Sequence, residues 1–193
     1  MMNWKKHLKA ATVLSMLMLG MTVAASAQNS IPANVSMSAN LAESVTVSLS
    51  GANVNFTLTS GSTSNPGDTT IDVTTDWVLK PGRASLKLFA YFDNASVALM
   101  HQTGYPLGQT PIDIPSSAVE VGVNGGPLTP VSSTVVFGAA NAGLQLFNQA
   151  ITGANKTGNR TDTLAFNVNL GSLAQLPADT YNGTLHIQAQ ATP

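Results

Sequence analysis

The sequence predicts an all-β protein, an antiparallel sandwich or barrel, and three observations support this class. Short runs of alternating apolar and polar residues recur along the chain, clusters of Gly, Pro, Asn and Ser separate them, and helical spacing is nearly absent. Alternation with a period of two gives a strand one apolar face, and regularly spaced turn residues are typical of antiparallel folds. The runs are SVTVSLS, NVNFTLT, TTIDVTTDWVL, ASLKLFAYF, SAVEVGV, STVVFG, DTLAFNVNL and GTLHIQAQA.

Residues 1–27 have the order of a secretory signal peptide. Lys5, Lys6 and Lys9 precede an apolar run, and the small residues ASA stand just before Gln28. A membrane anchor is the alternative, but about 14 apolar residues are fewer than the roughly 20 that span a bilayer. We therefore expect export to the periplasm, the cell surface or the extracellular space. Residues 28–193 should then form a single domain without a transmembrane anchor.

The first stretch of the expected mature chain, IPANVSMSANL, alternates strictly. Its apolar positions are Ile31, Ala33, Val35, Met37, Ala39 and Leu41. A lone strand cannot satisfy its backbone amides, so this segment needs the edge of a sheet, with pairing from about Ala33 because Pro32 lacks a donor. Its partner is either its own domain or a neighbouring subunit. The short connection LAES to the next run favours the first.

Turn motifs and one ambiguous stretch complete the expected organisation. In Lys80–Arg83, KPGR, proline presets the second position and Gly82 accepts a positive φ at the third, so we expect a type II turn closing a hairpin. Asn124-Gly125 follows an alternating run and predicts a second hairpin. Asn182-Gly183 is assigned to the opening of the last strand. The stretch GAANAGLQLFNQAI is interpreted as loop and strand, because Asn and Gly interrupt its helical spacing.

The composition limits the partners and the chemistry. Without residues 1–27, five basic residues remain against nine acidic ones, a net charge of −4, so nucleic acid is not an expected partner. The chain has no cysteine, which excludes a disulfide framework.

Residues for catalysis or metal binding do not form a recognisable set. His186 lies on the polar face of an alternating run and His101 at a strand edge, and no G-x-S-x-G or H-E-x-x-H motif occurs. Asp68, Asp72 and Asp76 recur every four residues, which on an extended chain spreads them too far apart to share a calcium ion. We expect no enzyme, no cofactor and no metal.

Two aromatic residues, Phe89 and Tyr91, fall on the strand face opposite Leu88 and Ala90. They are candidates for an exposed aromatic face that binds surface glycans. Trp77 is expected in the core instead.

The end of the chain, LPADTYNGTLHIQAQATP, places Tyr181 after an Asp-containing corner at the start of a strand. This arrangement is typical of the tyrosine corner before the penultimate strand of immunoglobulin-like sandwiches. The chain stops at Pro193, so we expect the last strand of that fold to be missing.

The two ends of the chain, VSMSANLAESVTVSLSGANVNFTL and LPADTYNGTLHIQAQA, resemble secreted bacterial pilin-type subunits of the spore coat protein U and archaic chaperone-usher group. The resemblance implies an incomplete immunoglobulin-like β-sandwich. In that family an alternating N-terminal segment of one subunit fills the groove of the next. A cysteine that the family usually has near residues 43–45 is absent here.

The function that this resemblance implies is a non-enzymatic structural or adhesive subunit of the cell surface. Its partners would be copies of itself or related subunits, joined by strand addition. The alternative is an extracellular carbohydrate-binding β-sandwich module that uses Phe89 and Tyr91.

Overall fold

The computed structural model describes residues 30–193, so the predicted signal peptide lies outside the described residues. The chain divides into two units between Asn40 and Leu41. Residues 30–43 form no helix or strand, and the side chains of Ile31, Val35, Met37 and Leu41 are between 81% and 92% exposed. Among residues 30–193, no helix is long and apolar enough to cross a membrane.

The alternating stretch Ile31–Leu41 is therefore not a strand in the single chain, because the first strand begins only at Ser44. Our preference for pairing within its own subunit is wrong for this structure. Alternation alone does not make a strand, since the backbone also needs an edge that supplies hydrogen bonds. Pairing with a neighbouring subunit stays a prediction.

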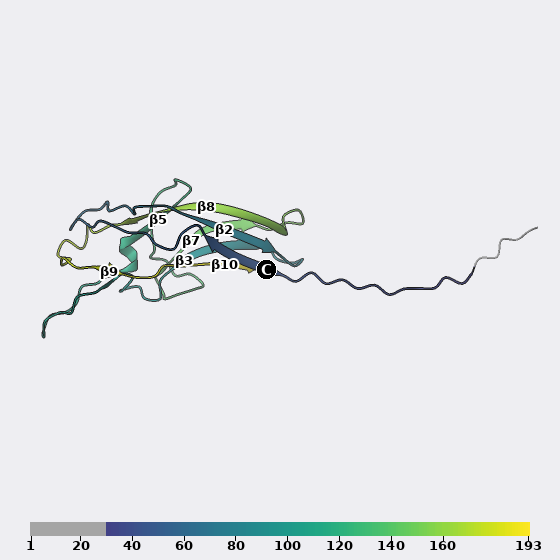
Figure 1. Cartoon of the computed structure of the whole chain (residues 1–193), viewed down its shortest axis with the longest axis horizontal. Coiled ribbons are helices and arrows are strands. Elements are labelled where there is room, and N and C mark those ends of the chain that lie inside the picture. The colour runs from purple at the N-terminus through teal and green to yellow at the C-terminus, as the bar shows by residue number, and fades with distance from the viewer. Residues whose placement is uncertain (1–29) are drawn as a thin grey trace, which may run out of the picture. The chain divides into compact units, whose positions relative to one another are not determined.

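The remainder of the chain is all-β, with antiparallel pairing throughout (Figure 1). The larger sheet has the order β1-β2-β8-β5-β6, the smaller has the order β10-β3-β7, and β4 pairs with β9. The elements are β1 (Ser44–Leu49), β2 (Ile71–Val78), β3 (Ser85–Tyr91), β4 (Met100–His101), the short 3-10 helix η1 (Ser116–Ala118), β5 (Val119–Val123), β6 (Thr129–Pro130), β7 (Gly143–Ala150), β8 (Thr157–Val168), β9 (Tyr181–Asn182) and β10 (His186–Thr192).

The apolar faces of the two larger sheets meet in one core. Val73 on β2, Leu88 on β3 and Leu164 on β8 are completely buried in it. Trp77 also lies in the core, as predicted, and its indole N–H donates to the carbonyl of Asn155 at 2.8 Å. Stability without disulfides therefore depends on this packing, which burial of apolar surface makes favourable.

The turn at Lys80–Arg83 has the predicted conformation, because Gly82 has a φ of +99°. The prediction that it closes a hairpin is wrong. The neighbours of β2 are β1 and β8, while those of β3 are β10 and β7, so the turn carries the chain from one sheet to the other. Turn chemistry sets the local reversal, but it does not decide which strands become neighbours.

Glu43, the residue before β1, ties the start of that strand to the same turn. Arg83 donates to its carboxylate from Nε at 2.8 Å and from Nη2 at 3.1 Å, and the Lys80 ammonium lies at 3.7 Å. The hydrogen bond from Arg83 is the main reason why the pKa of Glu43 falls to about 2. The carboxylate is therefore ionised at any physiological pH.

Of the two predictions made for Asn-Gly pairs, the one at Asn124-Gly125 is confirmed. Asn124 and Gly125 have φ values of +52° and +73°, and they connect β5 to β6 as a hairpin. Asn182-Gly183 is not a turn, because neither residue has a positive φ. The prediction that this pair opens the last strand is wrong, because Asn182 belongs to the separate short strand β9, which pairs with β4, and the last strand begins only at His186. The stretch assigned to loop and strand contains β7.

A buried ion pair lies between the sheets. Asp162 is 1% exposed and accepts hydrogen bonds from Arg160 at 2.6 and 2.7 Å and from Asn124 at 2.7 Å. Burial alone would raise the pKa of Asp162, but these hydrogen bonds and the charge of Arg160 outweigh burial and leave the pKa below its usual value. The Arg160 guanidinium also lies 4.5 Å from the ring centre of Phe147.

Candidate functional site

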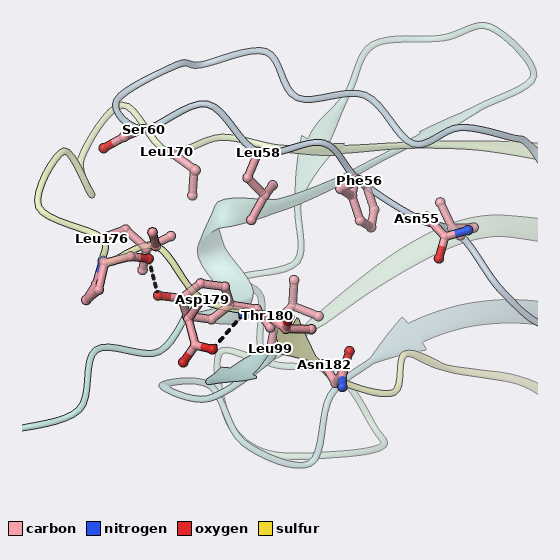
Figure 2. Close-up of a pocket in the computed structure, with 14 residues that line it drawn as sticks. Asn55, Phe56, Leu58, Ser60, Leu99, Leu170, Leu176, Asp179, Thr180 and Asn182 are labelled. Atoms are coloured by element: carbon pink, nitrogen blue, oxygen red, sulfur yellow. Dashed lines mark hydrogen bonds between the residues drawn. The ribbon is translucent and has the colours of Figure 1, made fainter. Parts of the chain in front are cut away.

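A groove lined by both polar and apolar groups lies between the chain that follows β1 and the chain that leads into β10. It consists of two adjoining cavities of about 560 and 440 Å³. We call residues 51–58 the first lip and residues 181–187 the second lip. The residues common to both cavities are Val54, Asn55, Phe56, Leu99, Tyr181 and Asn182. Figure 2 shows Phe56, Leu58 and Leu99 around the larger cavity, with Leu170 and Leu176 toward its far end.

The first lip keeps its alternation without forming a strand. Val54, Phe56 and Leu58 are half-buried against the core, whereas the residues between them are exposed. The run NVNFTLT was expected to be a strand, but it makes only an isolated bridge between Phe56 and Gly67. This lip is thus an apolar row with little backbone pairing of its own.

Asp68 holds the first lip in place. Its carboxylate accepts from the backbone N–H and the side-chain amide of Asn55, both at 2.9 Å. These hydrogen bonds lower the pKa of Asp68. The carboxylate thus satisfies one backbone donor of the first lip that no neighbouring strand pairs.

The second lip is anchored by Tyr181. The hydroxyl of Tyr181 donates to the carbonyl of Pro177 at 2.8 Å, four residues upstream, which is the bond expected of a tyrosine corner. Burial is the main reason why the pKa of Tyr181 rises to about 12, with a smaller contribution from Tyr105. Beyond it, a Cβ on Gly183 would collide with the backbone of Ala98, so the chain can pass here only as glycine.

Both lips present open backbone edges. β1 pairs only with β2, and β10 pairs only with β3. Within the described chain, no hydrogen bond joins the backbone of residues 51–54 or of residues 183–185 to another protein group. Such edges are templates for an added strand. An extended chain placed between the lips would meet backbone donors and acceptors on both sides and apolar side chains beneath.

Phe89 and Tyr91 do not form the exposed aromatic face that the sequence predicts. Phe89 is only 4% exposed, because the ring of Phe137 from the loop before β7 packs edge-on against it at 5.8 Å. Tyr91 stacks with His186 at 5.1 Å and with Phe137 at 5.8 Å. These partners come from β10 and from the loop before β7, so the half-buried Tyr91 ring packs against rings from two neighbouring elements.

The two histidines of the described chain pair with carboxylates. His101 Nδ1 lies 2.6 Å from Asp113 Oδ1, and His186 Nε2 lies 3.1 Å from Asp93 Oδ2. The first pair helps to close the base of the loop formed by residues 102–112, and the second holds the imidazole that stacks on Tyr91. Among residues 30–193, no three His, Asp or Glu side chains gather as a metal site would require.

Sequence reasoning found the second lip through its tyrosine but did not find the first lip as a groove wall. The sequence did contain a sign of this wall. The apolar residues Val54, Phe56 and Leu58 still alternate with polar ones after the pairing of β1 with β2 has ended. Comparison with family models, curated proteins and solved structures finds no match to this chain.

Proposed function

We propose that this protein is a non-enzymatic, exported structural or adhesive subunit of pilin type. Its fold would be an immunoglobulin-like sandwich that lacks one strand, and it would assemble by taking an extended segment of another copy into the groove. The observation that carries the proposal is the pair of lips, each with unpaired backbone groups, on either side of a groove whose lining includes the apolar side chains of Phe56 and Leu99.

The segment Ile31–Leu41 has the chemistry that such a groove requires. One face of the extended chain would be wholly apolar, and its large side chains are exposed in the single chain. Burial of that face is favourable, and the backbone of a strand would at the same time gain partners on both lips. A strand added in this way would link subunits without any covalent bond.

Deleting residues 28–41 tests the proposal. The truncated protein should remain folded, fail to form oligomers, and bind a synthetic peptide with the sequence of residues 31–41. The matched control is a peptide of the same composition in which the apolar residues are grouped together instead of alternating with the polar ones. Unfolding of the truncated protein, or equal binding of both peptides, would contradict strand donation.

The carbohydrate-binding alternative has less support. Stacking on sugars requires an accessible ring face, whereas Phe89 is buried and the half-buried Tyr91 ring packs against His186 and Phe137. A glycan array separates the two functions. Reproducible saccharide binding that Tyr91→Ala abolishes would favour the alternative.

A further inference from the structure

The charges of the domain are divided between its two ends. Strand register defines the first end, because Ser44 pairs with Val78, and Ser85 pairs with Thr192. We call this the segment end, since the chain N-terminal to β1 leaves the domain there. The groove end is opposite, where β1 ends, β2 begins and β3 ends, and where the loops that contain the two lips lie.

Every Lys and Arg of the described chain lies in the half of the domain toward the segment end. Lys80 and Arg83 are in the turn between β2 and β3, and Lys156 precedes β8 and accepts a backbone bond from Leu79. Lys87 is the third residue of β3, and Arg160 is neutralised by Asp162. The only other carboxylates in this half are Glu43 and Asp76. The segment end therefore carries a net positive charge.

The groove end has the opposite character. It holds six carboxylates and, among the described residues, no Lys or Arg. Asp93 is 79% exposed there, and Asp179 lines the mouth of the groove. The six are Asp68, Asp72, Asp93, Asp113, Glu120 and Asp179.

Strand donation would bring two such ends together. Only Ala42 and Glu43 separate Leu41 from the first residue of β1. Two extended residues span about 7 Å. A neighbour that takes the segment up to Leu41 must therefore lie against the segment end of the donor. Contact with the neighbour's own positive end would be repulsive, whereas contact with its groove end is attractive.

We propose that the segment end of one copy docks head to tail on the groove end of the next, and that the opposite charges of these ends select this arrangement. The inference rests on the proposed function for the contact itself, since donation creates it. The inference adds the surfaces that orient the two subunits and the electrostatic attraction that speeds their association.

Salt dependence distinguishes this docking from binding of the segment alone. The segment Ile31–Leu41 contains no charged residue, so binding of the synthetic peptide to the truncated protein should hardly change with salt. Assembly of the intact chain, followed by light scattering, should slow by about tenfold or more between about 10 and 300 mM NaCl, because salt shortens the range of the attraction. An assembly rate that is independent of salt would overturn the docking proposal.

Charge exchange provides the second test. A variant with Lys80→Glu and Lys156→Glu has two acidic ends, so the contact between its copies becomes repulsive. A variant with Asp72→Lys and Asp93→Lys keeps its basic segment end, but four carboxylates against two lysines leave its groove end only weakly acidic. Both variants should assemble more slowly than wild type, the first by the larger factor, because the attraction is reversed in the first and only weakened in the second. A wild-type assembly rate in either variant would overturn the proposal.

A control variant separates end charge from total charge. Thr161 and Gln145 are exposed on strands between the two ends, so Thr161→Glu with Gln145→Glu should assemble at close to the wild-type rate. Each variant must also bind the synthetic peptide after truncation. Loss of peptide binding in the truncated wild type refutes strand donation. Retained peptide binding with assembly that is insensitive to end charge refutes only the docking.

Discussion

Replacing Gly82 by alanine should destabilise the domain through backbone conformation alone. Gly82 has a φ of +99°, and an added Cβ would have no heavy atom within 4 Å, so crowding contributes nothing. A positive φ costs an L-residue about 1–2 kcal/mol. In a domain of this size that cost corresponds to a melting temperature lower by about 2–8 °C.

Gly153 provides the matched control for this experiment. It also has open space around its Cβ position, but its φ is not positive. Gly153→Ala should therefore leave stability unchanged or raise it by about 0.4–1 kcal/mol, because alanine restricts the unfolded chain. Urea denaturation of both variants measures the difference in unfolding free energy. Equal midpoints for Gly82→Ala and wild type would refute the assignment of a strained turn.

Three further variants test the interior, the second lip and the histidines. Asp162→Asn should destabilise the domain by about 2 kcal/mol or more at pH 7, because it leaves Arg160 facing a donor. Since folding lowers the pKa of Asp162, the contribution of its ionised carboxylate to stability is present at neutral pH and is lost as the pH falls below about 4. On acidification the variant should therefore lose less stability than wild type, as a series of urea titrations would measure. Tyr181→Phe should cost about 1 kcal/mol in the same assay, and an unchanged midpoint would argue against its hydrogen bond. His101→Gln together with His186→Gln should leave peptide binding intact, and loss of binding in a folded protein would reveal a role for these pairs.

The sequence predicted those features of the fold that depend on local chemistry. The alternation of apolar and polar residues identified the apolar faces of β2 and β10. Proline and glycine identified the turn at Lys80–Arg83, and the position of Tyr181 after an Asp-containing turn predicted the tyrosine corner. Each of these signals acts within a few residues, so no information about the remainder of the chain is needed.

The features that depend on neighbours were not predictable in the same way. The hairpin at Lys80–Arg83 was wrong because strand partners are chosen by the packing of two sheets. Phe89 appeared exposed because the alternation of its own strand does not show that Phe137, far along the chain, packs over that face of β3. The segment Ile31–Leu41 and the run containing Phe56 both have strand patterns without strand structure, since no edge in the single chain completes them.

The pairing of β2 with β8 has a consequence for the rate at which the domain folds. These strands are central in the larger sheet, yet Ile71 lies opposite Leu164. Closing a loop of about 90 residues costs roughly 4 kcal/mol of chain entropy before any of the ladder is gained. Such long-range pairing is typical of domains that fold in milliseconds to seconds. A newly synthesised chain therefore spends that time with its apolar strands unpaired, when capture by another copy competes with correct folding.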